Sequence, residues 1–503
     1  MALPLSPSPA IPSFYVPVVT PKAQETPTTI RVNALVYTSA ALALLQSAQF
    51  GWSLSQLNLS TFNDKDDCDS RPVAAGTCLM FPGHSKTEWT LAVNAWTVGG
   101  IVGSLICGSL SDAFGRRRTW FVSCALMIAG ATIQAASMSL PVFVVGRFVA
   151  GLASGFATAM CNGYINDVAP PHLRSMLGSC YGLSTATGIV LVGVSFFFAN
   201  TASGWRYIAG FPIVIAGVFL LLAPRYLAES PSWLLAKGRR EEAEAEIARL
   251  FGWENAATAL TWMETTPTTT ADESSTSKPS ERSTAELESH AQRSSPPPWK
   301  ALISTKYRRQ TLLALSMSVA LQFSGINVVF FYSSSMFKDA GVEDDRVGSL
   351  IVNMVNLLPS FVVGVLARRF GNRKMIIAGQ VGMLLSAVGL TIALLINVQA
   401  LSIVFMSTYV AGFSLSLGPL AFAVASDLFP DALRANGIAL TLFVNWCGTF
   451  VIGVGYPYIA DVLDDLAFLP FIAVLSFFVF FMTKKLPETS GKTSVEIQGL
   501  FQH

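Results

Sequence analysis

The chain has 503 residues, of which 52% are hydrophobic and only 13% are charged, and its formal net charge is +2. Ordinary soluble domains contain about 25% charged residues, and a mean hydropathy of +0.51 leaves too little polar surface for a soluble protein of this size. The composition therefore predicts an integral membrane protein, and the nearly neutral charge gives no indication of nucleic-acid binding.

The first 30 residues contain seven prolines and lack the apolar core of a signal peptide. We expect residues 1–30 to form a disordered cytoplasmic tail. After it come eleven long stretches without Asp, Glu, Lys or Arg: 32–63, 89–111, 119–146, 148–166, 175–205, 207–224, 310–337, 347–367, 375–426, 435–460 and 466–483.

A helix needs about 20 apolar residues to cross the hydrocarbon core. The stretch 375–426 is long enough for two crossings, with a turn near residues 397–400. We therefore predict an all-α protein with twelve transmembrane helices, in which Arg147 separates the third helix from the fourth. The frequent Gly and Ser residues favour helices that pack closely on one another.

Basic residues follow the second, eighth and twelfth predicted helices, at 116–118, 368–374 and 484–485. Because cytoplasmic loops are enriched in Lys and Arg, both termini are expected in the cytoplasm, and the plasma membrane is the expected location. The connection 63–88 then lies outside. It contains Cys68 and Cys78, between which a disulfide is compatible with an oxidising compartment.

The middle of the chain changes character after the sixth predicted helix. Residues 229–254 are charged and amphipathic, as in surface helices, and residues 265–298 are a Ser/Thr/Pro-rich linker. The predicted organisation is a six-helix bundle over 31–227, cytoplasmic helices and linker over 228–306, a second bundle over 307–484 and a cytoplasmic tail over 485–503. The segment 255–300 could recruit cytosolic partners.

Three charged signatures occur once in each half, in the same order. DVAPPHLRSM at 167–176 returns as DLFPDALRAN at 427–436, and SDAFGRRR at 111–118 returns as LARRFGNRK at 366–374. Glu229 and Glu488 follow the last helix of each half. These pairs predict two copies of one six-helix unit, related by an axis along the membrane normal.

Several motifs together resemble the sugar porter branch of the major facilitator superfamily, most closely its facilitative glucose transporters. They are QFGW at 49–52, GRFVAG at 146–151, AESPSWLL at 228–235, QFSGINVVFFYS at 322–333, NW at 445–446 and PETSG at 487–491. The resemblance covers about residues 32–490. It implies the major facilitator fold, transport of a sugar by alternating access, and no enzymatic activity. No cofactor is expected, and the scattered histidines indicate no metal site.

In similar transporters, charges at the cytoplasmic helix ends latch the two bundles together while the cavity faces outwards. The matching residues here are Asp112, Arg116, Asp167, Arg174 and Glu229 in the first half, and Asp427, Arg434 and Glu488 in the second. Arg368 stands where the second copy usually has an acid, so the second latch is expected to be weaker. The alternative is that these charges only determine topology.

A sugar site needs amide side chains, which both donate and accept hydrogen bonds, and an aromatic face. Interrupted helices such as those at Ser324-Gly325 and Gly418-Pro419 are typical of transporter binding sites. We expect substrate-binding residues at Gln322, Asn327, Asn353, Phe422, Asn445, Trp446 and Ile189, and gating residues at Tyr332, Gly418 and Pro419. The alternative for any one Asn is a hydrogen bond between helices.

Three positions depart from the glucose-transporter pattern. Gly182 and Leu321 replace glutamines, and Phe422 replaces a tryptophan, preceded by Ala421 instead of proline. A site that binds through hydrogen bonds discriminates strongly between substrates. We therefore expect a hexose such as glucose, with fructose, another monosaccharide or a polyol as open alternatives.

Proton-driven sugar porters carry an Asp two positions after the FG of the first helix, and this chain has Ser53 there. Arg147 would be the partner of that Asp. Without a titratable partner no proton carrier is expected, so the sequence predicts passive uniport. A proton-coupled sugar or polyol symporter and a sugar receptor that does not transport are the alternatives.

Overall fold

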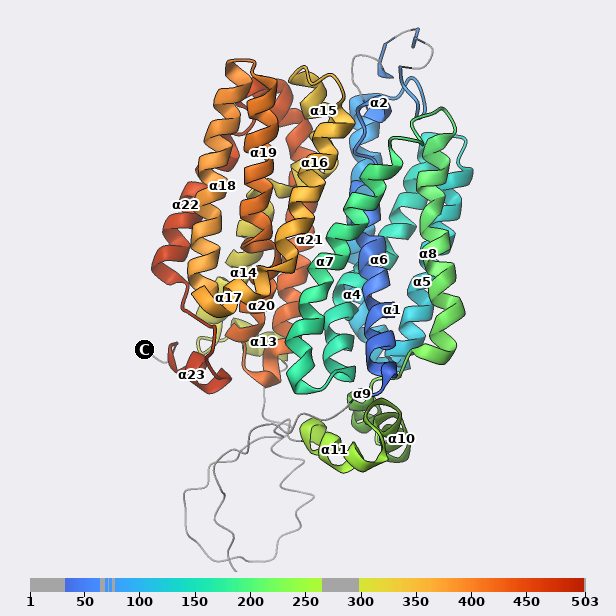
Figure 1. Ribbon diagram of the computed structural model, residues 1–503, viewed down its shortest axis with the longest axis vertical. Helices are drawn as coiled ribbons and strands as arrows, with labels where there is room; N and C mark the ends of the chain where they lie inside the picture. Colours follow the sequence, from blue (N-terminus) through green and yellow to red (C-terminus); the bar gives the residue numbers. More distant parts are fainter. Residues whose placement is uncertain (1–31, 64–67, 71, 75–76, 265–297, 502–503) are drawn as a thin grey trace, which may run out of the picture.

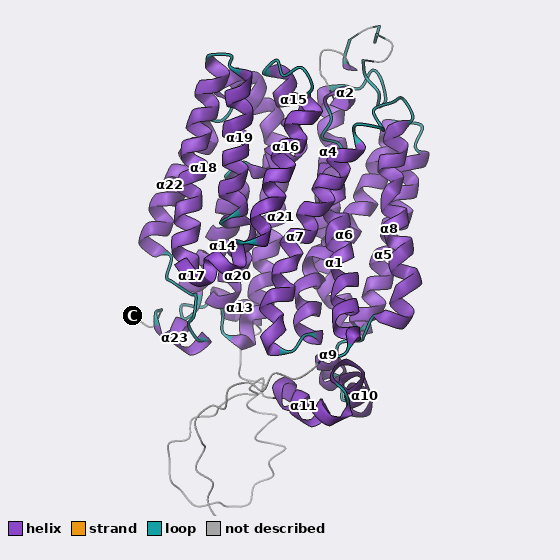
Figure 2. Cartoon of the chain, viewed as in Figure 1, coloured by secondary structure: helices purple, strands orange, loops and turns teal. Residues whose placement is uncertain are grey.

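The computed structural model describes residues 32–63, 68–70, 72–74, 77–264 and 298–501 (Figure 1). The tail expected over 1–30 and nearly all of the linker expected over 265–298 lie outside these ranges. The described ranges are helical and contain no strand (Figure 2). The fold is therefore all-α, as predicted.

The first bundle is built from six long helices and one short one. They are α1 (Ala34–Ser55), α2 (Ser60–Asn63), α4 (Lys86–Phe114), α5 (Arg116–Ala136), α6 (Leu140–Val168), α7 (Pro171–Ser195) and α8 (Gly204–Tyr226). Three short helices follow at one end of this bundle: α9 (Pro231–Ala236), α10 (Arg240–Phe251) and α11 (Ala256–Glu264). We call this end of the molecule the inner end, and the opposite end, which carries α2, the outer end.

The second bundle is divided into more helical pieces than the first. They are α13 (Pro298–Ile303), α14 (Arg308–Phe323), α15 (Ile326–Asp339), α16 (Asp345–Leu357), α17 (Val363–Phe370), α18 (Asn372–Leu395), α19 (Gln399–Ser414), α20 (Leu417–Leu428), α21 (Asp431–Leu463), α22 (Leu469–Lys485) and α23 (Ser494–Gly499). Figure 1 shows this half, in yellow to red, beside the blue-to-green first half. The bundles touch where α4 meets α21 and where α7 meets α16.

The number of membrane spans agrees with the prediction of twelve. Nine helical spans in the described ranges are long and apolar enough to cross a membrane, with α14–α15 and α19–α20 each counted once. The pair α16 and α17, joined by a short 3-10 helix and bent by 53°, gives a tenth. The 22-residue α1 and the 17-residue α22 complete the twelve.

Two predicted interruptions are confirmed. Between α14 and α15, Gly325 has φ +90°, and a Cβ atom there would lie 2.8 Å from the ring of Phe471. Between α19 and α20 the break falls at residues 415–416, just before Gly418-Pro419. Pro419 occupies the first turn of α20, where its missing N–H leaves no helical hydrogen bond unmade.

The expectation that Arg147 separates two helices is wrong. The turn lies at residues 137–139, and Arg147 sits inside α6 with only 1% of its surface exposed. Its guanidinium donates to the carbonyl oxygens of Ser53 at 3.0 Å and Val93 at 3.4 Å, and it lies 5.5 Å from the ring of Trp96. Because these groups solvate the charge, the helix continues through it.

Candidate functional site

Three predicted amides meet at the break between α14 and α15. The Nε2 of Gln322 donates to the Oδ1 of Asn445 at 2.7 Å, and the Nδ2 of Asn327 donates to the Oε1 of Gln322. Asn327 also donates to the hydroxyl of Thr449 at 3.3 Å. We call these four residues the amide network. Thr449 was not predicted, although it lies one helical turn after Asn445 on α21.

The interruption itself brings these amides together. Gln322 is near the end of α14 and Asn327 is near the start of α15, so the left-handed backbone at Gly325 turns the two side chains towards each other. The hydroxyl of Tyr409 on α19 donates to the carbonyl of Ser324, an acceptor freed by the break. The network thus depends on a local departure from helical geometry.

Trp446 joins the two bundles beside the amide network. Its ring lies 5.3 Å from Trp96 and 6.0 Å from Phe50, both in the first bundle, and its Nε1 donates to Thr158 at 3.4 Å. A Cβ atom on Gly100 would lie only 2.4 Å from this indole. The aromatic face expected for the site therefore comes from both halves.

The remaining predicted substrate residues do not hydrogen-bond to the amide network. Asn353 on α16 is buried at the boundary between the bundles, where its Nδ2 would lie 3.0 Å from a Cβ atom on Gly193 of α7. Ile189 is buried on the same helix α7, and Phe422 on α20 packs against the apolar core. Gly182 faces open space, with nothing within 4 Å of where its Cβ would be.

Tyr332, the predicted outer gate, is buried in the outer half of the second bundle. Its hydroxyl donates to the carbonyl of Gly453 at 3.0 Å, and its ring lies 5.7 Å from that of Tyr456. Both tyrosines line a cavity at the outer end.

Hydrogen bonds across the two bundles concentrate at the outer end. Asn58 lies between α1 and α2, is buried, and donates to the hydroxyl of Ser333 at 2.8 Å. Its Oδ1 accepts from the backbone N–H of Ser334 at 3.1 Å, and the N–H of Ser60 donates to the hydroxyl of Ser334 at 2.9 Å. These contacts bind the end of α1 to α15.

An ion pair adds to this outer closure. Lys86, the first residue of α4, pairs with Asp461 near the end of α21 and also donates to the carbonyl of Pro457. Its Nζ lies 5.2 Å from the ring centre of Tyr458. Asn58, Lys86 and their partners were not predicted, because their sequence separation of 275 to 375 residues gives no local pattern.

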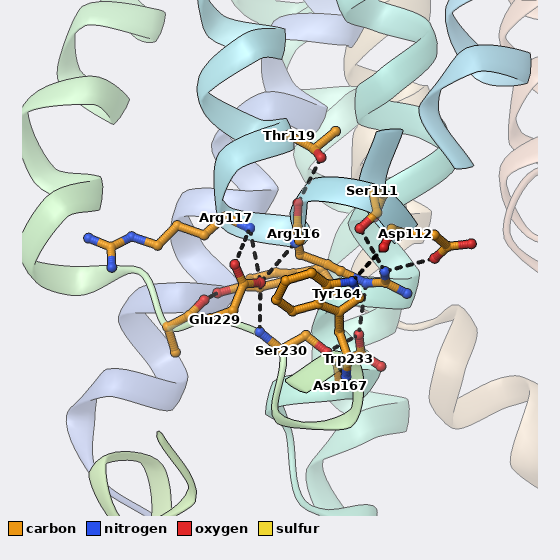
Figure 3. Close-up of polar contacts among 12 residues, drawn as sticks. Ser111, Asp112, Arg116, Arg117, Thr119, Tyr164, Asp167, Glu229, Ser230 and Trp233 are labelled. Atoms are coloured by element: carbon orange, nitrogen blue, oxygen red, sulfur yellow. Dashed lines mark hydrogen bonds and ion pairs between the residues drawn. The ribbon is translucent and has the colours of Figure 1, made fainter. Parts of the chain in front are cut away.

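At the inner end of the first bundle, Glu229 caps a helix (Figure 3). Its carboxylate accepts from the backbone N–H groups of Arg116 at 2.8 Å and Arg117 at 3.1 Å, the first two residues of α5. A carboxylate at a helix N-terminus satisfies free N–H groups and complements the helix dipole. In this structure Glu229 therefore binds backbone N–H groups of its own bundle.

The arginine side chain of this cluster turns to other acids. Arg116 pairs with Asp112 at 2.9 Å and with Asp167 at 3.5 Å. Asp167 also accepts from the hydroxyl of Ser230 at 2.6 Å, and Arg174 donates to the carbonyl of Ala169 at 3.0 Å. These contacts stay within the first half of the chain.

The second half repeats the cap of the first half. Glu488 accepts from the backbone N–H groups of Asn372 at 2.9 Å and Arg373 at 3.2 Å, the first residues of α18. Asn372 occupies the place of Arg116, and its side chain donates to Thr489 at 3.0 Å. Arg434 donates to the carbonyl of Ser426 at 3.3 Å, and Asp427, near the end of α20, is partly buried.

The outer loop between α2 and α4 contains a disulfide between Cys68 and Cys78, next to His84. These are the only three side chains in the described ranges grouped closely enough to suggest a metal site, and the two sulfur atoms are bonded to each other. Burial lowers the pKa of His84, whose ring stacks on Trp89 at 4.8 Å. The folded loop therefore favours the neutral form of His84.

Comparisons with known proteins agree with this arrangement. Residues 36–501 match the family described as "Sugar (and other) transporter". Facilitated glucose transporter member 4 of solute carrier family 2 from Bos taurus is 30% identical over 489 residues, which cover 94% of this chain and 91% of that protein. Member 2 from Gallus gallus is 31% identical over 429 residues, which cover 82% of this chain and 76% of that protein.

Solved structures match along most of the chain. The proton:xylose symporter XylE bound to 6-bromo-6-deoxy-D-glucose has a TM-score of 0.73 at 21% identity, over 93% of this chain and 99% of that one. The inward open form of XylE from E. coli has a TM-score of 0.74 at 22% identity, over 92% and 99%. At these identities the likeness establishes the fold, which is that of the major facilitator superfamily. Together with the match over residues 36–501, it shows that the chain is a multi-pass membrane protein of the sugar transporter family.

Proposed function

We propose that the chain carries a hexose passively across the membrane by alternating access. The observation that supports this most strongly is the amide network of Gln322, Asn327, Asn445 and Thr449 at an interrupted helix. The relatives named as facilitated glucose transporters support the hexose and the passive mode. Members of this family are transporters, so no enzymatic activity is assigned.

The chemistry of the network suits a transported ligand. A sugar hydroxyl that enters it replaces an amide–amide hydrogen bond with an amide–hydroxyl bond of similar strength, about 0.5–1.5 kcal/mol net. Binding is then weak enough for release on the other side. The indole of Trp446 would cover a C–H face of the sugar, while Asn353, Ile189 and Phe422 would complete its surroundings.

The bonds at the outer end suggest which state this is. Asn58, Ser60 and Lys86 hold the two bundles together there, whereas the carboxylates of Glu229 and Glu488 bind within their own bundles at the inner end. We assign an inward-facing state, with Tyr332 closed and the residues around Gly418 and Pro419 forming the inner gate. In the outward-facing state, the inner charged clusters would meet and the outer bonds would break.

In this mechanism the two bundles, over residues 31–227 and 307–484, rotate against each other to open the site to each side of the membrane in turn. We propose that the inner end, both termini and α9–α11 lie in the cytoplasm, which the basic residues after the second, eighth and twelfth helices support. The plasma membrane is the proposed location, and the segment 255–300 is the proposed contact for cytosolic partners. The disulfide between Cys68 and Cys78 fits an extracellular outer loop.

Passive transport follows from the surroundings of Arg147. Carbonyl oxygens of Ser53 and Val93 and the ring of Trp96 stabilise its charge, and position 53 offers no carboxylate that could bind and release a proton. The resemblance of the fold to a proton:xylose symporter keeps proton coupling as the second candidate.

Flux of a labelled hexose into proteoliposomes tests the proposal. We expect saturable uptake, and competition by unlabelled glucose, fructose, galactose, xylose and inositol would rank the substrates. Hexose binding without flux would identify a receptor instead. Because Gly182 leaves open space and Leu321 offers no amide, we expect broader competition than a site with two more glutamines would give.

A further inference from the structure

A cavity of about 240 Å³ opens at the outer end, between the two bundles. Its wall on the first bundle comes from the start of α4, with Lys86 and Trp89. Its wall on the second bundle comes from α15, the turn between α18 and α19, and the end of α21, with Tyr332, Tyr456 and Asp464 among others. None of the residues of the amide network lines it.

The charges on the cavity wall exclude an anionic ligand. Four carboxylates line it, from Asp339, Asp461, Asp464 and Asp465, against the single ammonium group of Lys86. Lys86 is engaged with Asp461. The cavity therefore offers an excess of hydrogen-bond acceptors.

The cavity wall also contains a buried donor that lacks an acceptor. Trp89 is only 4% exposed, and its indole Nε1–H has no hydrogen-bond partner among the described residues. A buried donor left unpaired costs about 1–3 kcal/mol. Because this N–H is buried within the wall, a ligand oxygen can accept from it once the Trp89 ring turns towards the cavity. The rings of Tyr332, Tyr456 and Phe468 add apolar faces to the same wall.

Carboxylate acceptors, an unpaired N–H donor and aromatic faces match the chemistry of a carbohydrate. Its hydroxyl groups donate to carboxylates, its oxygens accept from an indole N–H, and its C–H faces pack on rings. An organic cation would suit the carboxylates and rings. It would, however, leave the Trp89 donor unpaired and face the like charge of Lys86.

We propose that this cavity is an outer docking site where a neutral sugar binds while the gate at Tyr332 is closed. The inference rests on the proposed function, since it takes the transported sugar as the ligand. The sugar would wait beside Lys86 and Asp461, the ion pair that must separate before the outer end can open. Docking and gating would thus share one set of residues.

Photolabelling of sealed cells that express the full chain tests the site. A membrane-impermeant photoreactive hexose reaches only the outer face, and the modified peptides can be identified by mass spectrometry. To keep the outer end closed, Asn58→Cys and Ser333→Cys, whose native side chains are in hydrogen-bond contact, are cross-linked. We expect labelling of the peptides around Trp89 or Asp464, with protection by free hexose.

Two substitutions localise the binding. Trp89→Phe keeps an aromatic ring and removes the donor, and Asp464→Asn keeps the shape and removes the charge, so each should reduce labelling at least about fivefold. Asp344→Asn is the matched control, since Asp344 lies on the outer face, caps α16 and does not line this cavity. Labelling should be unchanged in it.

The outcomes separate this proposal from the proposed function. Hexose flux by the uncross-linked chain without protectable outer labelling would overturn the docking site alone. Labelling that persists in both Trp89→Phe and Asp464→Asn would overturn it too, as would protection by an impermeant quaternary ammonium but not by hexose. Absence of both flux and labelling would instead contradict the proposed function.

Discussion

The two bundles share one plan, yet only the second is interrupted beside the candidate site. In the first, α4 and α6 run unbroken for 29 residues each and pack so closely that a Cβ atom on Gly99 would lie 2.1 Å from the carbonyl of Phe148. In the second, three spans are broken, at residues 324–325, 358–362 and 415–416. We interpret the first bundle as a rigid support and the second as the half whose backbone groups, freed from helical hydrogen bonds at the breaks, and buried amides can exchange partners.

The helix caps at the inner end are the same in both halves. Glu229 and Glu488 bind the N-termini of α5 and α18 in the same way. Arg117 and Arg373 each donate to a carbonyl near the end of the last span of their own half, Pro224 of α8 at 2.8 Å and Thr483 of α22 at 2.7 Å. The repeat thus preserves contacts to backbone, while the ion pairs of Arg116 belong to the first half.

The largest expected effect is on hexose uptake, and it distinguishes an amide that binds substrate from an amide that only stabilises the fold. Asn327→Ala should reduce hexose uptake about 10- to 100-fold, because loss of a hydrogen bond at a buried polar group costs about 1–3 kcal/mol. Gln134→Ala breaks a buried amide pair of the first bundle, in which Gln56 donates to Gln134 at 2.9 Å. It should lower the melting temperature and leave the KM for hexose unchanged. Equal KM changes in the two variants would remove the distinction between the halves.

A glycine in each bundle tests whether the interruptions matter. Gly325→Ala should destabilise the protein by about 1–3 kcal/mol, because a residue with a Cβ atom is strained at a positive φ and would meet Phe471. Gly163→Ala, in unbroken α6 with nothing within 4 Å, should be neutral or slightly stabilising. Thermal unfolding in detergent compares them, and similar melting temperatures would argue against a strained break.

The two caps should differ in their effect on the conformational equilibrium. Glu229→Gln should move the population further towards the inward-facing state, since it removes a negative charge from the inner cluster of Arg116, Asp112 and Asp167, which would meet the second bundle in the outward-facing state. Glu488→Gln should have a smaller effect. Labelling rates of a cysteine placed in the inner cavity report the change, and an unaltered rate in Glu229→Gln would count against a latch.

The outer ion pair should have a moderate effect of opposite sign. Lys86→Met should favour the outward-facing state by up to about fivefold, because partly exposed ion pairs contribute about 0–1 kcal/mol. Labelling of an outer-cavity cysteine from outside measures this. The exchange Lys86→Asp with Asp461→Lys should restore the original rate; failure to do so would mean that the pair does not hold the bundles together.

The smallest effect concerns the outer loop of the first bundle. Because burial lowers the pKa of His84, protonation favours the unfolded loop. Its contribution is therefore present above the ordinary pKa of about 6.5 and is lost as pH falls through and below that value. The melting temperature should drop more between pH 7 and pH 5 in the wild type than in His84→Phe, which keeps the ring stack on Trp89. Parallel pH profiles would contradict this.

Several features of the fold could be predicted because they are local. The breaks at Gly325 and before Pro419 follow from residues that cannot continue a helix, and the turn between α18 and α19, at residues 396–398, follows from the length of an apolar stretch. The place of Arg147 could not be predicted from its own neighbours. In the sequence, a charged residue between two apolar stretches indicates a helix end. Only the fold shows that Ser53, Val93 and Trp96, from other helices, stabilise the charge inside a continuous helix.

Local sequence signals also explain which residues of the candidate site were predicted and which were missed. Gln322, Asn327 and Asn445 were predicted because amides in apolar helices are conspicuous; the structure brings them together, and their binding of substrate stays a prediction. Thr449 was missed because a hydroxyl in a helix commonly bonds to its own backbone, as Thr449 also does to the carbonyl of Asn445. Lys86 and Asp461 were missed because each lies at a helix end, where charged residues are ordinary.

The most direct test of passive transport through the amide network is the plateau of hexose uptake in proteoliposomes under an imposed pH gradient. We predict that the internal concentration stops at the external one, whichever side is acidic, and that Asn327→Ala slows the approach without changing the plateau. Accumulation of hexose above the external concentration, driven by protons moving down their gradient, would contradict the account.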